Sequence, residues 1–195
     1  MRAFLLGGLI GLAVLAATAL LPAREPPLPK RPSFKHHELT GGRAELNLAP
    51  RTSSVFLFDE DLWPTEAWAP AARDAAESGR WAGSGAGVLT AILPGPRRRP
   101  LPVTVRVTRS EPRLAAADDH VVDVDLDLRS GGLVVAGTGA VAADFIAVPA
   151  GAYRARIAGQ GYRVARGATR LRIDLWLRAG EQAPRLRRRW PGWTG

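Results

Sequence analysis

The chain has 195 residues, a formal net charge of +9 at pH 7 and no cysteine. The lack of cysteine excludes disulfide bonds, thiolate metal sites and a lipid-modified cysteine. The excess positive charge lies in the two ends, because residues 44–178 hold 17 arginines against 15 acidic residues, which leaves only +2.

The first residues indicate a segment addressed to a membrane. An apolar run occupies residues 3–21. At about 1.5 Å per residue a helix of this length reaches roughly 28 Å, so it could anchor the chain in a bilayer core of ~30 Å. The alternative is a cleaved signal peptide over residues 1–23, with Ala17 and Ala19 as the cleavage signal. In both cases the rest is expected to be exported or membrane-anchored and extracytoplasmic; an over-called start codon would make it cytoplasmic.

Residues 24–43 are predicted to form an extended linker. Its four prolines cannot continue a helix or donate to a strand ladder. The adjacent pair His36 and His37 is a candidate metal site. Neighbouring positions on a strand cannot both face one ion, and nothing nearby completes a coordination sphere, so we expect no metal there.

Residues 44–178 are predicted to form one domain that is mainly β. Its short runs alternate between apolar and polar residues, with glycine or proline between most of them. This pattern predicts a single antiparallel β-sandwich or barrel-like domain with one short helix, preceded by the N-terminal apolar helix. Pro70 suits the first turn of the short helix, and Gly79 suits its left-handed stop. The expected strands cover residues 45–48, 54–58, 87–93, 103–108, 121–128, 133–136, 145–148, 153–158 and 171–177.

An alternating acidic strand is the most distinctive pattern in this domain. Asp123, Asp125 and Asp127 share one face of the expected strand, and valines and leucines share the other. Residues 129–132 then predict a hairpin turn into residues 133–135.

The row of three aspartates has two interpretations. Its carboxylates stand about 6.6 Å apart, too far for all three to bind one small cation. Arg154, Arg156 and Arg172 have the same outward phase on other strands, so cross-strand ion pairs on an exposed face are expected. The alternative is a metal-binding or acid–base role for two of the carboxylates.

No enzyme motif accompanies the aspartates. The chain lacks a Gly-x-Ser-x-Gly sequence, a P-loop and paired histidines at helical spacing. The glycine-rich residues 83–87 precede a strand rather than a helix, so they predict a turn and not a phosphate site. His120, beside Asp119, is expected at the surface rather than in a catalytic role. We therefore assign no catalytic residue, no cofactor and no metal.

Residues 179–195 are predicted to be a basic tail that contains tryptophan and does not pack on the domain. Arginine beside tryptophan can bind phosphates of a nucleic acid or an anionic membrane surface. The alternative is a solvated tail in a chain biased toward arginine, since lysine occurs only 2 times against 25 arginines. The residues expected to bind a polyanion are Arg185, Arg187, Arg188, Arg189 and Trp190.

The order of elements over roughly residues 53–177 resembles the competence protein J family. The features that carry the resemblance are the helix at residues 68–79, the glycines at 83–87 before a strand, residues 102–108 with Ser110 and Glu111, the acidic strand from Val122, and the turn from Val148 to Arg154 that leads to Leu175 and Trp176. That family is associated with inhibiting a DNA-entry nuclease. The resemblance implies a β-rich binding module with no active site of its own.

Together these observations predict a non-catalytic binding module. The leading hypothesis is a nuclease inhibitor-like protein that contacts a protein partner through a sheet surface. The alternatives are a metal-assisted hydrolase that uses the three aspartates and a structural cell-envelope protein. The residues expected to contact a partner are Asp123, Asp125, Asp127, Arg154, Arg156 and Trp176.

Overall fold

The structure is a computed structural model that describes residues 33–49, 52–62, 68–85, 87–94, 99–138, 142–162 and 169–192. The expected N-terminal apolar helix, the first part of the expected linker and Trp193 lie outside these residues. Within the described ranges, no helix is long and apolar enough to cross a bilayer.

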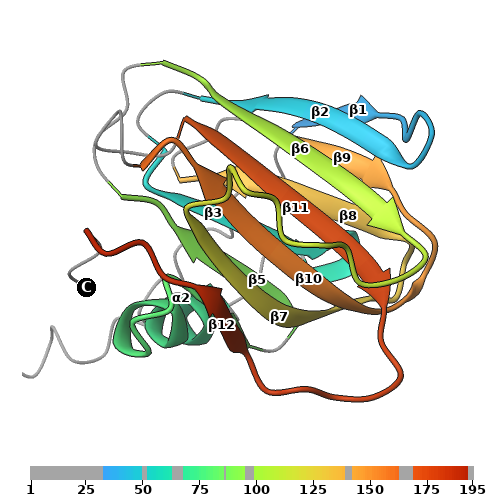
Figure 1. The fold of residues 1–195 in the computed structure, drawn as a ribbon. Helices are drawn as coiled ribbons and strands as arrows, with labels where there is room; N and C mark the ends of the chain where they lie inside the picture. Colours follow the sequence, from blue (N-terminus) through green and yellow to red (C-terminus); the bar gives the residue numbers. More distant parts are fainter. Residues whose placement is uncertain are drawn as a thin grey trace, which may run out of the picture. The chain divides into compact units, whose positions relative to one another are not determined.

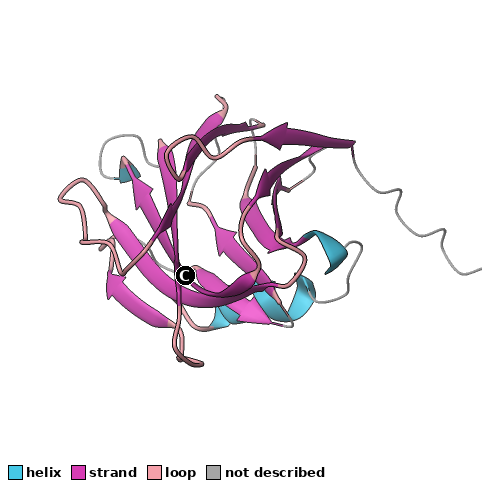
Figure 2. Cartoon of the chain, turned by 90° about the vertical axis from the view of Figure 1, so that its right-hand side faces the viewer, coloured by secondary structure: helices cyan, strands magenta, loops and turns pink. Residues whose placement is uncertain are grey.

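Two six-stranded sheets pack face to face, and one α-helix lies on the outside of the first (Figures 1 and 2). In order across sheet A the strands are β1 (Ser33–His37), β9 (Ala142–Ala147), β8 (Gly132–Gly137), β3 (Ser54–Asp59), β5 (Val88–Ile92) and β4 (Ala82–Gly85). Across sheet B they are β12 (Arg185–Arg188), β7 (His120–Leu128), β10 (Gly151–Gln160), β11 (Arg170–Leu177), β6 (Leu101–Thr108) and β2 (Arg43–Leu48). The helical elements are the 3-10 turn η1 (Glu60–Leu62) and the helix α2 (Trp68–Glu77).

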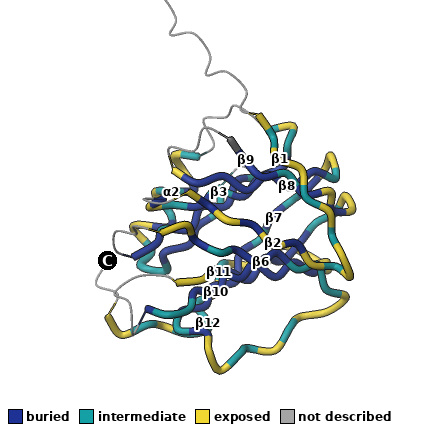
Figure 3. The backbone as a smooth tube through the Cα atoms, turned by 90° about the horizontal axis from the view of Figure 1, so that it is seen from above, coloured by how far each residue is buried: buried dark blue, intermediate teal, exposed yellow. Residues whose placement is uncertain are grey.

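The core lies between the two sheets. Figure 3 shows buried residues along the strands of both sheets and exposed residues mainly in the connections. The alternation in β7 turns Val122, Val124 and Leu126 inward, where they join aliphatic residues from both sheets. The expected mainly-β architecture with one α-helix is therefore confirmed for the described chain.

The expectation of a purely antiparallel domain is wrong. β1 pairs in parallel with β9, and β6 pairs in parallel with β11. Each sheet is therefore mixed. Parallel strands cannot be joined by a tight turn, and in both pairs the two strands are indeed far apart in the sequence.

The predicted hairpin between residues 121–128 and 133–136 is also wrong. β7 belongs to sheet B and β8 to sheet A, so the turn between them carries the chain from one sheet to the other. Asp59 at the end of β3 holds this crossing, since its Oδ2 accepts a hydrogen bond from the Ser130 N–H at 2.8 Å. All six residues of β8 are buried, as expected of a central strand covered on both faces.

Part of the expected linker is a strand. β1 falls inside residues 24–43, and two side-chain contacts fix it to β9. The ring of Phe34 lies 6.0 Å from that of Phe145, and His37 Nε2 lies 2.7 Å from Asp144 Oδ1. His36 is exposed and its ring lies 4.8 Å from that of Phe145 in a tilted contact, so the two histidines do not face a common ion.

The glycine-rich stretch also forms a strand, β4, where a turn was expected. Helix α2 packs directly on it. A Cβ atom added to Gly83 would lie 2.3 Å from the Ala75 backbone nitrogen and 2.7 Å from the Ala71 carbonyl oxygen. Only glycine permits this close approach of helix to strand.

The expected loose tail is ordered at least as far as residue 192. β12 pairs with the start of β7. Trp190 packs against the core, with its ring 5.3 Å from that of Tyr162 in an edge contact. Apolar contacts of Leu186 and Trp190 thus attach this segment, so the expectation that it does not pack on the domain is wrong.

Candidate binding site at the edge of the sandwich

The outer face of sheet B carries a network of ion pairs that begins at Asp123. Arg156 donates to both of its oxygens, with Nε–Oδ1 at 2.7 Å and Nη2–Oδ2 at 2.8 Å. Arg156 also donates to Glu111 Oε1 at 2.6 Å and to the Pro112 carbonyl. The expected cross-strand pair is confirmed, but it is not exposed: Asp123 is 2% accessible and Arg156 is inaccessible. The chain after β6 covers them.

Arg154 and Arg172 extend the network in different directions. Arg154 Nη1 lies 2.6 Å from Asp125 Oδ1, as the sequence predicted. Arg172 has no partner in the aspartate row and instead pairs with Asp118 at 2.7 Å and with Asp174 at 2.9 Å. That expectation was wrong because β11 is separated from β7 by β10.

The pKa values follow from this pairing. Burial alone would lower the pKa of Arg156, but hydrogen bonds to Asp123 and Glu111 outweigh it and raise the pKa above its usual value. Burial and the Asp118 hydrogen bonds act in the same opposing way on Arg172, whose pKa is also raised. The hydrogen bond from Arg156 lowers the pKa of Glu111. Arg156, Arg172 and Glu111 are therefore charged at neutral pH.

Most residues expected to contact a partner are thus already engaged inside the chain. Trp176 is 9% accessible, and the guanidinium of Arg156 lies 5.3 Å from its ring centre. Asp123, Arg154 and Arg156 are buried. These side chains hold sheet B together and do not form an open surface. Asp127, whose side chain is 42% exposed, is the most accessible member of the row.

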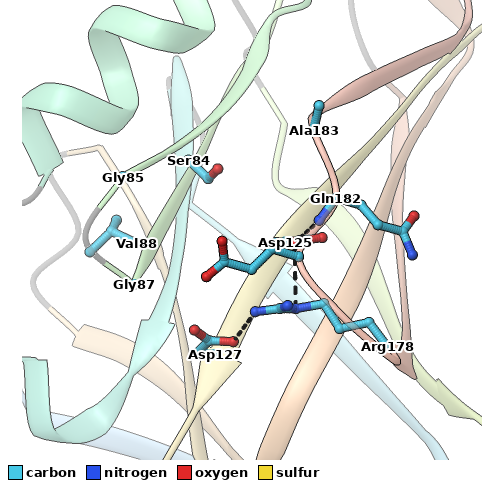
Figure 4. A pocket seen from close by; sticks show the side chains of 10 residues that line it. Ser84, Gly85, Gly87, Val88, Asp125, Asp127, Arg178, Gln182 and Ala183 are labelled. Carbon is cyan, nitrogen blue, oxygen red and sulfur yellow. Dashed lines mark hydrogen bonds and ion pairs between the residues drawn. The ribbon is translucent and has the colours of Figure 1, made fainter.

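A cavity of about 400 Å³ opens beside Asp125 and Asp127 (Figure 4). Its lining comes from three parts of the chain: the end of β4 with the start of β5, the second half of β7, and the connection from β11 to β12. The lining residues are Ser84, Gly85, Gly87, Val88, Asp125, Asp127, Arg178, Glu181, Gln182 and Ala183.

Arg178 holds the two aspartates in place. Its Nη2 lies 2.8 Å from Asp127 Oδ1, and its Nε lies 3.4 Å from Asp125 Oδ2. Asp125 Oδ2 also accepts the Gln182 N–H at 2.8 Å. Figure 4 shows Arg178 reaching between the two carboxylates. Asp125 is therefore fully engaged, whereas Asp127 Oδ2 has no partner among the described residues.

The lining has an excess of negative charge. It contains the carboxylates of Asp125, Asp127 and Glu181 and a single guanidinium, that of Arg178. Arg154, just outside the lining, offsets one further charge through Asp125. The exposed carboxylate of Glu181 and the second oxygen of the partly exposed Asp127 remain to interact with a cation that enters the cavity.

Of the lining residues, Asp125 and Asp127 were predicted from the sequence as candidate contact residues, and the others were not. Arg178 continues the outward phase of Arg172, Asp174 and Trp176, so the alternation of β11 contained the signal that it would face the aspartates. Glu181 and Gln182 lie in a connection with no periodic pattern, and only the fold brings them to the cavity.

The lining offers little for catalysis. Among the described residues that line it there is no histidine, and Ser84 carries the only hydroxyl group. Over the described parts of the chain, no three residues of the types His, Cys, Asp and Glu gather in a way that could hold a metal ion. The arrangement suits recognition of a cationic group better than bond cleavage.

His120 lies elsewhere and is buried, which contradicts its expected surface position. Trp190 N–H donates to its Nδ1 at 3.2 Å, so Nε2 carries the proton and donates to the Arg80 carbonyl at 3.1 Å. Burial lowers its pKa to about 4. Both ring nitrogens are hydrogen-bonded, so His120 attaches the chain just after β12 to the core and is not available as a base.

The four arginines near the C-terminus divide into two pairs. Arg187 lies 3.2 Å from Glu111, and Arg188 donates to the carbonyls of Ala115 and Asp118 at 2.9 and 2.6 Å. Arg185 and Arg189 are exposed. The structure therefore leaves only part of the expected basic cluster on the surface, and Trp190 packs inward.

Comparisons with known proteins found distant structural likeness only. No protein-family model matches the chain, and no curated protein sequence matches it. The crystal structure of ComJ, inhibitor of the DNA degrading activity of NucA, from Bacillus subtilis, is similar with a TM-score of 0.49 and 16% identity over 70% of this chain and 95% of that one. The product of crocagin biosynthetic gene J is similar with a TM-score of 0.47 and 16% identity over 69% and 96%. These are fold-level resemblances.

Proposed function

We propose that this chain is a non-catalytic binding module that recognises a partner protein through the acidic cavity at the edge of the sandwich. The observation that carries the proposal is the excess of carboxylates at the cavity, where Glu181 is exposed and Asp127, whose side chain is 42% exposed, is paired with Arg178 through one oxygen. A lysine or arginine side chain of a partner is the group that this arrangement would accept.

The internal ion pairs support this proposal. Asp125 is held from both sides by Arg154 and Arg178, so the floor of the cavity does not need to rearrange when a cation binds. A preformed site loses less conformational entropy on binding than a flexible one.

We further propose that the partner protein is a nuclease. An enzyme that degrades DNA must carry basic side chains where it contacts phosphates. Such a surface complements an acidic cavity, and occupying it would block access of DNA. The same surface charge would make the contact sensitive to salt.

Affinity capture with the wild-type chain and its variants tests the proposal. The full chain, a double variant Asp127→Asn with Glu181→Gln, and the control Glu38→Gln would each be used to capture proteins from the source cells. Glu38 is exposed and does not line the cavity. We expect a partner that the wild type and the control retain, that the double variant loses, and that elutes as salt rises. Equal capture by all three proteins would contradict a role for the cavity. Addition of the full chain to the captured partner, with DNA degradation as the readout, then tests the nuclease assignment.

A further inference from the structure

β7 is paired along only part of its outer edge. On one side, β10 pairs with it from His120 to Leu128. On the other side, β12 pairs only with residues 121–123. No strand in the described parts of the chain pairs with the outer edge of residues 124–128. Alternate backbone N–H and C=O groups of a strand point to each edge, so this stretch presents unused donors and acceptors.

Pro184 explains why the pairing stops. It lies directly before β12 and has no N–H to donate to a ladder. The preceding residues are instead drawn over the outer face of sheet B. Arg154 donates to the carbonyls of Gln182 and Ala183 at 2.9 and 2.8 Å, and Asp125 accepts the Gln182 N–H. The chain therefore crosses the outer face of sheet B before it pairs with β7, and it leaves this part of the β7 edge uncovered.

The open edge and the acidic cavity lie in the same place. Asp125 and Asp127 belong to the unpaired stretch and line the cavity. The opposite wall is formed by Ser84, Gly85 and Gly87, which carry no bulky side chain, and by Val88. An extended chain that entered here would meet backbone groups of β7, carboxylates on one side and the small residues of the opposite wall on the other.

We propose that the outer edge of residues 124–128 accepts an extended basic segment of the partner protein as an added strand. This inference rests on the proposed function and specifies how the cavity is used. Five residues of strand extend about 17 Å. Side chains of the added strand that share a face with Asp125 and Asp127 would be lysine or arginine, since cross-strand neighbours lie about 5 Å apart. The alternate side chains would face the opposite wall, where Ser84, Gly85 and Gly87 leave room for them, and would be apolar. Backbone hydrogen bonds supply affinity, and the alternation supplies specificity.

A synthetic peptide tests this mode of binding. The probe is the capped hexapeptide Val-Arg-Val-Arg-Val-Arg, titrated calorimetrically into the full chain. Two analogues carry N-methyl groups on the three valines or on the three arginines. Both keep the charge and the extended preference of the parent, but each blocks the amides of one edge of the peptide strand.

We expect one analogue to bind at least tenfold more weakly than the parent and the other to bind nearly as well, because only one edge of an added strand faces β7. In hydrogen exchange, amides within residues 124–128 should be slowed by the parent peptide. Asp127→Asn with Glu181→Gln should weaken binding of the parent at least tenfold, and Glu38→Gln should leave it unchanged.

Two outcomes would overturn the proposal. If both analogues bind like the parent and still require Asp127 and Glu181, the cavity attracts charge without strand addition, and the proposed function stands alone. If the parent does not bind, or if its binding is unaffected by the double variant and leaves residues 124–128 unprotected, the edge is not a docking site. The affinity capture with wild-type and variant chains then decides separately whether the cavity binds a partner protein.

Discussion

The two sheets cover their outer faces in opposite ways. On sheet A the cover is apolar: the ring of Trp68 in α2 stacks 4.9 Å from that of Phe56 and lies 5.6 Å from that of Phe58. On sheet B the cover is ionic, and the buried pair of Asp123 and Arg156 lies at its centre. Both faces are largely closed to solvent, yet one uses dispersion and the hydrophobic effect and the other uses paired charge.

The comparison shows what each solution demands. An apolar cover tolerates imperfect contacts, because its cost grows with the area left uncovered. An ionic cover requires every buried charge to keep its partner, because an unpaired buried ion is far more costly than the pair is favourable. Sheet B should therefore be sensitive to changes of one partner and much less sensitive to removal of both.

The largest expected effect comes from breaking the central pair. Arg156→Met leaves the Asp123 carboxylate buried without its main partner and should lower the free energy of unfolding by about 3–5 kcal/mol, measured by urea denaturation. Combining it with Asp123→Leu should recover part of that loss. A double variant less stable than the single one would contradict the view that the cost comes from leaving one buried charge without its partner.

Acid should destabilise sheet B through His120, whose ring lies on the buried, inner side of β7. Its pKa is about 4 in the folded chain and about 6.5 when unfolded, so only the unfolded state binds a proton between these values. Stability should therefore fall as pH drops from 7 to 4, by about 3 kcal/mol from this group. His120→Asn should remove this part of the pH dependence of the thermal midpoint. An unchanged slope in that variant would place the titration elsewhere.

Removal of β1 tests the apolar contacts of sheet A. Deletion of residues 1–42 takes away the contact of Phe34 with Phe145 and should cost about 2 kcal/mol. Deletion of residues 1–32 should leave the urea midpoint unchanged, since that segment precedes β1. If the shorter deletion also destabilises the fold, the apolar N-terminal run contributes to the core, and our expectation that it only directs location fails.

The smallest effect is expected at the cavity. Asp127 is partly exposed and its pair with Arg178 is screened by water, so Asp127→Asn should change stability by less than about 1 kcal/mol. A thermal melt can measure this. A loss comparable to that of Arg156→Met would identify Asp127 as a structural residue and remove it from the proposed binding site.

Most strands could be predicted from alternation alone. In β7, the valines and aspartates correctly indicated both the strand and its two faces. β12 could not be found in this way, because Arg-Leu-Arg-Arg shows no alternation and its pairing depends on Trp190 and Leu186 meeting the core. β4 was equally hidden, since Gly83 and its neighbours favour a turn locally and form a strand only beneath α2.

The cavity could be predicted only in part, for a related reason. Asp125 and Asp127 are marked by their own periodicity, but their depth of burial and their partners depend on which strands become neighbours. The predicted hairpin would have placed β8 beside β7, and the structure places β10 and β12 there. Local patterns specify faces, and the order of strands depends on contacts between residues far apart.

The parallel pairing of β1 with β9 has a consequence for synthesis. Ser33 lies opposite Ala142 in this ladder, so the first described strand has no partner until most of the chain has been made. Until then Phe34, the apolar side chain of this strand, lacks its contact with Phe145 and is available to other strands and to chaperones. The growing chain therefore has to keep β1 unpaired until β9 has been made, and β1 joins sheet A only late in folding.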